Sequence, residues 1–289
     1  MSAGAVGAAR DRPDHLDDAI GLFGPDSVSW RIDRELVVLA GGSCALLMQA
    51  AHPSVAAGVA EHSTYATDPF GRLLRTLTSS FDVVFGTRTE AEATIRRVNA
   101  IHRAVRGTRP DGKPYSALEP DALLWVHATL VDTALRMYHR FVAPLSHADA
   151  QRYHVESAAV AVHLGVPERL VPPTIAELRA WMATMVHDGV VHVTPQARHI
   201  ARTVLYPVRF PPRIAWDAAH LFSLASLPPE LRRQYGIGWS PARERGIDRL
   251  AAASRRCLPL LPPALRHAPR ARAADRRVRA EMRRTSTGG

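Results

Sequence analysis

Signals that begin and end helices recur along almost the whole chain, and they constrain its fold more than any other feature. A capping side chain stands directly before proline at Asp68-Pro69, Thr194-Pro195 and Ser240-Pro241, and proline suits the first helical position. Glycine, which commonly ends helices, closes two of the helical patterns at Gly86 and Gly165. No segment shows sustained apolar–polar alternation bounded by hairpin turns. The sequence therefore predicts an all-α, multi-helix single domain of roughly eight to ten helices.

Several helix boundaries follow from the same signals. The expected helices run over residues 69–85, 89–106, 121–142 and 146–164, with another opening at Thr174. Thr89 and Glu92 are spaced as a capping box for the second of these helices. The short run 189–193 is the one segment with β-like composition.

Residues 36–60 carry no formal charge and are long enough on paper to cross a bilayer. Gly41, Gly42, Gln49 and Pro53 interrupt this stretch. The interruptions favour a buried helix followed by a break, so no stable membrane span is predicted.

The 289 residues and the charge distribution suggest one core domain with loose ends. The expected division is a loose N-terminal segment over 1–26, an all-helical domain over 27–266 and an arginine-rich tail over 267–289. The net charge is +10, and Lys113 is the only lysine. Because no aromatic residue is interleaved with the arginines after residue 243, a solvated or weakly anion-binding tail is favoured over a nucleic-acid-binding arm.

The cysteines and the N-terminus bear on the compartment. Cys44 and Cys257 lie far apart and fit no metal-binding spacing. The first residues lack the basic-then-apolar pattern of a signal peptide. A reducing, cytoplasmic location is the expectation.

Histidine is the residue type with the most chemical interest. In the helix expected after Thr89, His102 lies in an apolar stripe with Ile95, Val98 and Ile101. A buried imidazole needs a partner for each ring nitrogen. The pattern by itself leaves three alternatives open: a core histidine with satisfied nitrogens, a ligand of haem iron or another metal, and some other role.

Arg72 and Thr76 lie four residues apart and share one face of the helix over 69–85. Pointing into a cavity, the two side chains would supply hydrogen-bond donors for a bound oxygen or a carboxylate. Exposed to water, they would have no such role.

Weaker candidates lie in the helix over 121–142 and at the break near residue 52. Trp125, His127 and Thr129 are either core residues or pocket residues. His52 and His62 are ten residues apart across a break, which is not a standard zinc spacing.

Several segments together resemble a known family. In chain order they are SVSWRIDREL, LLMQAAHPSVAAGVAEHS, DPFGRLLRTL, VNAIHRAVRG, PYSALEPDALLWVHATL and YGIGWSPARER, which together cover about residues 27–262. They are similar to the oxygenase family that includes the fungal mycophenolic-acid pathway enzyme MpaB and the catalytic domain of rubber oxygenase, also called latex-clearing protein.

The resemblance implies a globin-like helical core that binds haem b. It implies that His102 is the proximal iron ligand and that Arg72 and Thr76 lie near the haem and support activity. Trp125, His127 and Thr129 stay weaker pocket candidates that rest on the helix pattern alone. It also implies oxygenase chemistry, with O₂ and a hydrophobic small molecule as substrates and oxidative C=C cleavage as the model reaction. Two family features are missing: the distal lysine, because Lys113 lies in a DGKPY turn, and an arginine where Cys44 stands.

Three functions follow as hypotheses. The first is a haem-b-dependent oxygenase with no nucleic-acid partner. The second is a haem-binding sensor or carrier without turnover. The third is a haem-free helical interaction protein, for which the arginine-rich tail would matter most.

Overall fold

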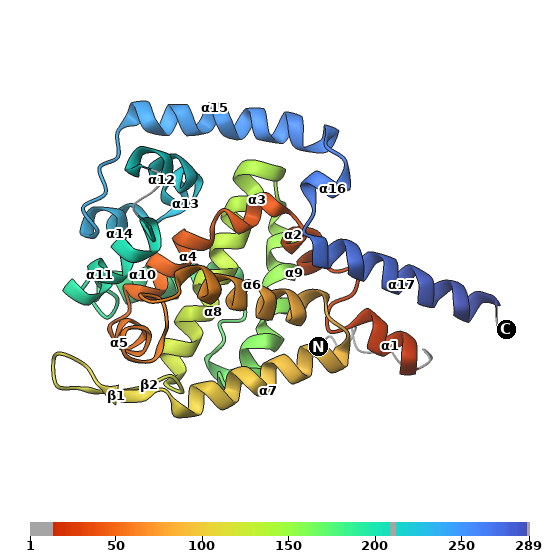
Figure 1. Ribbon diagram of the computed structural model, residues 1–289, viewed down its shortest axis with the longest axis horizontal. Coiled ribbons are helices and arrows are strands. Elements are labelled where there is room, and N and C mark those ends of the chain that lie inside the picture. Colours follow the sequence, from red (N-terminus) through yellow and green to blue (C-terminus); the bar gives the residue numbers. More distant parts are fainter. Residues whose placement is uncertain (1–13, 209–211, 288–289) are drawn as a thin grey trace.

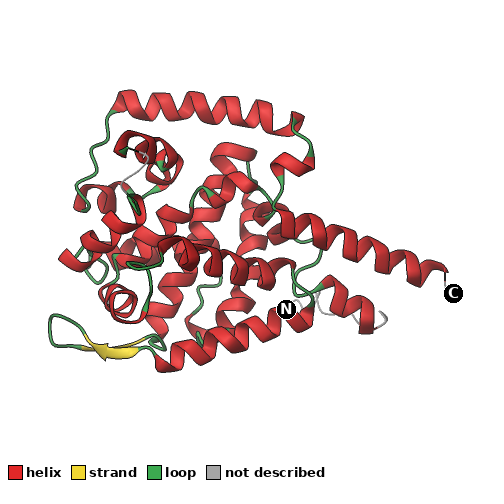
Figure 2. Ribbon diagram, viewed as in Figure 1, coloured by secondary structure: helices red, strands yellow, loops and turns green. Residues whose placement is uncertain are grey.

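The computed structural model describes residues 14–208 and 212–287, and most of these residues are helical (Figures 1 and 2). Within that part of the chain the β structure is one antiparallel hairpin of β1 (Arg106–Thr108) and β2 (Pro114–Ser116). The prediction of an all-α single domain is confirmed. The helices are more numerous and shorter than expected.

The first half of the chain contains α1 (Asp14–Ile20), α2 (Val28–Asp33), α3 (Leu36–Leu39), α4 (Gly42–Ala50), α5 (Pro53–His62), α6 (Pro69–Phe85), α7 (Arg88–Ala104) and α8 (Pro120–Met137), which continues as a π-helix over Tyr138–Val142. The second half contains α9 (His147–His163), a 3₁₀ turn over Glu168–Leu170, α10 (Ile175–His187), α11 (Pro195–Leu205), α12 (Arg213–Ala219), α13 (Leu221–Ser226), α14 (Pro229–Gln234), α15 (Pro241–Cys257), a 3₁₀ turn over Leu258–Leu260, α16 (Pro263–Arg266) and α17 (Pro269–Thr287).

The cap-then-proline signals mark real helix starts. The side chains of Asp68, Thr194 and Ser240 each accept a hydrogen bond from a backbone N–H three residues later. These bonds satisfy donors that have no partner inside the helix.

The expected capping box was placed two residues too late. The box is formed by Thr87 and Glu90. Thr89 instead donates its N–H and its hydroxyl to Asp18 Oδ1 of α1, at 2.9 and 2.8 Å. A tertiary contact therefore uses the residue that local spacing assigned to the cap.

The β-like run 189–193 is not a strand, which corrects the sequence reading. Val191 N–H donates to the Met185 carbonyl, and His192 N–H donates to the Ala51 carbonyl. The segment therefore closes α10 and ties it to the end of α4 instead of pairing as a strand.

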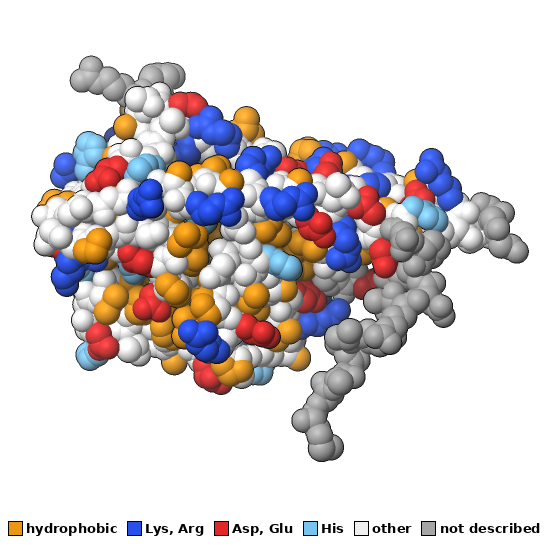
Figure 3. All heavy atoms as spheres, turned by 90° about the horizontal axis from the view of Figure 1, so that it is seen from below, with side chains coloured by type: hydrophobic (Ala, Val, Ile, Leu, Met, Phe, Trp, Pro, Cys, Tyr) orange, Lys and Arg blue, Asp and Glu red, His pale blue; other side chains and the backbone are white. Residues whose placement is uncertain are grey.

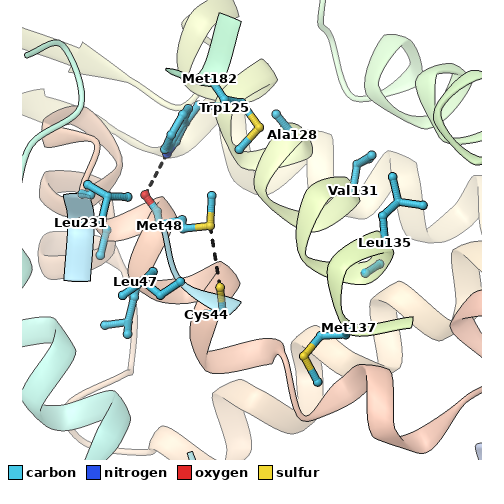
Figure 4. Close-up of a cluster of buried hydrophobic side chains, with 14 of the residues drawn as sticks. Cys44, Leu47, Met48, Trp125, Ala128, Val131, Leu135, Met137, Met182 and Leu231 are labelled. Carbon is cyan, nitrogen blue, oxygen red and sulfur yellow. Dashed lines mark hydrogen bonds between the residues drawn. The ribbon is translucent and has the colours of Figure 1, made fainter. Parts of the chain in front are cut away.

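Helix α8 runs through the centre of the molecule and packs against α4, α9, α10 and α13. Figure 4 shows its inner face against α4, where Met48, Trp125 and Ala128 lie in the main hydrophobic cluster. Trp125 is fully buried, and its indole Nε1–H donates to the Met48 carbonyl at 2.9 Å. This bond removes the cost of burying the indole nitrogen.

The uncharged stretch 36–60 folds as short, sharply bent helices. Among the described residues no single helix is both long and apolar enough to cross a membrane; the segments Leu36–Ala50 and Pro53–His62 reach the length only together, with a bend of 108° between them.

The C-terminal segment is not a loose tail, which corrects the expectation from composition. Helix α17 buries Ala271, Ala274 and Val278 in a second cluster with Trp30 and Phe85. Asp275 accepts a hydrogen bond from Trp30 Nε1 at 3.0 Å and pairs with Arg34. The arginines are thus one face of an amphipathic helix whose alanine face packs on the domain. On the N-terminal side, α1 packs against α7 and α17.

Candidate functional site

The site begins with the hairpin of α6 and α7. Each helix has 17 residues, and Gly86 and Thr87 join them. Gly86 ends α6 where there is no room for a side chain, because a Cβ added there would lie 2.2 Å from the Asp82 carbonyl oxygen of the same helix. In such an antiparallel pair, the start of α6 lies level with the end of α7. Arg72 and His102 are therefore brought to the same end, which we call the open end.

The open end packs less tightly on the domain than the turn end. Along the apolar stripe of α7, Ala91 and Ile95 are buried, whereas Val98 is half-buried and Ile101 is 57% exposed. On α6, Leu74 is 66% exposed. Figure 3 views the molecule from the α7 side and shows hydrophobic side chains at this surface beneath a row of arginines. Apolar side chains that are not buried mark a surface available to a ligand or partner.

Arg72 turns inward from the open end. Its Nε–H donates to Ser63 Oγ at 2.6 Å, and within the described chain its two Nη atoms donate no hydrogen bond. Burial, and then the neighbouring Arg75, lower the pKa of Arg72. A half-buried guanidinium with free donors is suited to bind an oxygen atom.

A small cavity of about 20 Å³ lies at Arg72. The residues that line it come from α4, α5, α6, α11 and the segment before α6; they are Leu46, Gln49, Ala50, Val59, Tyr65, Arg72, Ile200 and Val204. Except for Gln49, Tyr65 and Arg72, the lining is apolar. A cavity of this size holds about one water molecule.

Gln49 links the cavity to α8. Its Nε2–H donates to Thr129 Oγ1 at 3.2 Å, and the Thr129 hydroxyl in turn donates to the Val126 carbonyl. Thr129 is fully buried, so it reaches the cavity only through Gln49. No sequence motif singles out Gln49, because a glutamine within an uncharged stretch indicates only an interruption of that stretch.

His102 carries an unpartnered nitrogen. The ring is half-buried, and its Nδ1 is buried with no hydrogen-bond partner among the described residues. Burial lowers the pKa of His102, which favours the neutral imidazole. A neutral imidazole with a free nitrogen is the form that ligates a metal.

Thr76 does not share the cavity with Arg72. Its side chain is exposed, and its hydroxyl donates to the Arg72 carbonyl at 2.9 Å. Threonine commonly makes this bond to the residue four positions earlier in a helix. It supports the turn that carries Arg72.

Trp125 and His127 lie away from the open end. Trp125 packs against Met48 and Trp181 in the main core. His127 is buried with its Nε2 unpartnered, and burial together with the nearby His154 lowers its pKa to about 4. The structure therefore brings Arg72, Gln49 and Thr129 together and leaves Trp125 and His127 in the core between α4, α8 and α9.

Two other metal-binding arrangements find no support in the described residues. No group of three or more His, Cys, Asp or Glu side chains there is placed to hold an ion. His52 and His62 stand at opposite ends of α5, about 15 Å apart along a helix of that length. Burial raises the pKa of the Cys44 thiol to about 12, so Cys44 is a neutral core side chain.

The fold and these residues define an all-α domain with a polar site at one end of a helical hairpin. The chain belongs to the family described as "ER-bound oxygenase mpaB/B'/Rubber oxygenase, catalytic domain", whose family model matches residues 30–256. The family resemblance drawn from the sequence is thereby confirmed, and with it a general oxygenase-like function.

Two curated relatives are similar to this chain. They are uncharacterised proteins of Mycobacterium bovis and Mycobacterium tuberculosis, each 28% identical over 226 residues, which is 75% of this chain and 87% of the relative. The comparison with solved structures gave no significant match.

Proposed function

We propose that this protein is a haem-b-dependent oxygenase that acts on a hydrophobic small molecule, with oxidative cleavage of a C=C bond as the reaction. The observation that carries the proposal is the buried, unpartnered Nδ1 of His102 at the same end of the hairpin as the half-buried Arg72. Membership of an oxygenase family supports the same conclusion. Bound haem would supply the iron at which O₂ is activated.

The residues present suit such a group in their chemistry. His102 would hold the iron as a neutral imidazole, because burial keeps its pKa low. Arg72 would hold an oxygen atom by hydrogen bonds from its free Nη atoms, which the apolar surroundings strengthen. Thr76 would act through its bond to the Arg72 carbonyl.

The cavity at Arg72 is much smaller than a ligand pocket, which usually measures about 300–1,000 Å³. Its volume is about 20 Å³. Haem binding at this place therefore requires the open end of the hairpin to move away from α4. The exposed apolar residues Leu74 and Ile101 show that this end has little packing to lose.

The first test is haem content measured on the purified full chain. We expect a Soret band at one haem per chain, and we expect His102→Ala to lose the haem while circular dichroism shows the helices retained. His187→Ala is the matched control, because His187 is an exposed histidine at the end of α10. Full haem content in His102→Ala would remove His102 as the ligand, and a colourless wild-type protein that takes up no added haem would favour a haem-free interaction protein.

The second test separates an oxygenase from a haem sensor or carrier. O₂ consumption is measured with isoprenoid and other alkenes, on the wild type and on Arg72→Gln. We expect turnover in the wild type and a large loss of kcat in Arg72→Gln with haem still bound. Stoichiometric haem without O₂ consumption on any alkene would support the carrier.

A further inference from the structure

A second and much larger cavity lies on the other side of α11. It has a volume of about 690 Å³, within the range of small-molecule sites. Its walls come from α11, the start of α12, α13, the segment after α14 and the start of α15. These elements lie together at one side of the molecule below α15 (Figure 1). Consecutive elements within residues 198–243 thus form a site that no motif predicted.

The cavity concentrates positive charge. Its lining includes Arg198, Arg202, Arg213 and Arg243, and among the described residues Asp217 is the one acidic side chain that lines it. Asp217 already accepts a hydrogen bond from the Tyr206 hydroxyl at 2.6 Å. Within the described part of the chain, none of the four arginines forms a salt bridge.

Some arginines elsewhere in the described chain differ from these four in having carboxylate partners. Arg140 pairs with both Glu244 and Asp248, and Arg270 pairs with both Asp82 and Glu90. The chain therefore supplies carboxylates to arginines that hold helices together. Among the described residues the arginines of the large cavity have no such partner, and a bound anion would relieve their mutual repulsion.

Three of these guanidinium groups are held in place. Arg213 lies over the Tyr206 ring at 4.6 Å, and Arg243 donates to the Gly238 carbonyl at 2.9 Å. Arg198 donates to the Gln234 carbonyl at 3.1 Å. Carbonyl and ring contacts orient a guanidinium without neutralising its charge, so less conformational entropy is lost when an anion binds.

Arg202 is the fourth arginine, and its guanidinium is available to bind an anion. It lies one helical turn after Arg198 on the same face of α11. Its guanidinium forms no hydrogen bond or ion pair with another described residue. Leu205 and Leu224, both buried, add an apolar surface to the same cavity.

From this arrangement we infer that the large cavity binds an organic phosphate, with its phosphate groups on the arginines and its organic part against Leu205 and Leu224. Several guanidinium groups around one cavity match an anion with several oxygens and at least two charges, because each guanidinium can bind two oxygens side by side. The inference does not depend on the proposed haem site, although Ile200 and Val204 on another face of α11 line the small cavity at Arg72.

The test is calorimetric titration of the full chain with inorganic pyrophosphate, without added haem. We expect one site per chain and a Kd at least about tenfold higher in Arg202→Gln and Arg213→Gln. Arg249→Gln is the matched control, because Arg249 is an exposed arginine of α15 outside the cavity. Equal weakening by Arg249→Gln would show binding to net charge alone and overturn the inference, as would the absence of saturable binding.

Two further titrations test the class of ligand. Succinate should bind more weakly than pyrophosphate, and equal binding would contradict the preference for phosphate. ADP carries an aromatic organic group and hexyl phosphate an aliphatic one. At least one of the two should bind more tightly than pyrophosphate, which has no organic group. If both bind more weakly than pyrophosphate, the role given to Leu205 and Leu224 is wrong.

Discussion

The two ends of the α6–α7 hairpin differ sharply in how they are held. At the turn end Phe85 is fully buried edge-on against Trp30, with ring centroids 5.2 Å apart. Arg270 of α17 bridges Asp82 and Glu90 across the two helices. At the open end, by contrast, Leu74 and Ile101 remain exposed.

The difference separates stability from the candidate chemistry. The turn end is packed by α1, α2 and α17, whereas Arg72 and His102 lie at the open end. Segments with few buried apolar contacts open at a lower free-energy cost than packed ones. A hairpin fixed at one end can therefore move at the other without unfolding.

The largest effect is expected at the turn end. Phe85→Ala removes a fully buried ring of α6 that packs against α2 and α17, and should lower the free energy of unfolding by about 3–5 kcal/mol. Urea denaturation followed by circular dichroism measures it. A loss below about 1 kcal/mol would show that the turn end is no better packed than the open end.

Acid should destabilise the domain through two buried histidines, His127 in the core and His52 directly before α5. Burial lowers the pKa of His52 and of His127 to about 4. The unfolded chain takes up protons near pH 6.5 and the folded chain does not, so stability falls as the pH drops from about 6.5 to 4, by on the order of 2–3 kcal/mol per histidine.

Hydrogen exchange can locate the part of the acid effect that comes from His52. His52 precedes α5, and Gly58 of α5 lies against Val105, just beyond the open end. Hydrogen exchange at pH 5 should rise in α5 and the end of α7 before α17. His52→Gln should flatten the pH dependence, whereas the exposed control His187→Gln should not. Exchange that rises first in α17 would show that the turn end, and not the open end, loosens first in acid.

A smaller loss of stability is expected when the contact of Asp275 with Trp30 and Arg34, which joins α17 to α2, is removed. Asp275→Ala removes the acceptor of Trp30 Nε1 and the partner of Arg34, which should cost about 1–3 kcal/mol. The measurement is thermal unfolding, with Arg279→Ala at an exposed position of α17 as the control. Equal losses in the two variants would mean that helix content alone, and not docking on Trp30, sets the stability of the turn end.

The smallest effect is expected at the open end. Leu74→Ser changes a side chain that is 66% exposed, so the free energy of unfolding should change by less than about 0.5 kcal/mol. Urea denaturation alongside Phe85→Ala gives the direct contrast. A loss above about 1 kcal/mol would show that the open end is packed in solution.

Local signals predicted much of the fold. Asp68, Thr194 and Ser240 cap helices as expected, because a capping bond joins residues only three positions apart. The failures involve distant partners. Thr89 was assigned to a cap and instead bonds to Asp18. The C-terminal segment was expected to be loose, because composition does not reveal that its alanines pack against Trp30 and Phe85.

For the candidate site, the sequence named Arg72 and His102, and the hairpin brings them to one end. It also named Thr76, whose hydroxyl is bonded to its own helix, and Trp125 and His127, which lie in the core. Periodicity places a side chain on a helix face, but it does not say what that face packs against.

The sequence by itself determined the helical class and the family, because these depend on local spacing and short motifs. Through the family resemblance it also named Arg72 and His102 as candidate site residues. Only the tertiary structure decided which end of the hairpin is held, that Gln49 joins Arg72 to Thr129, and that four arginines without carboxylate partners among the described residues line one cavity. The reason is physical: burial and charge compensation depend on segments that meet in space from distant parts of the chain, and local preferences carry no information about those meetings.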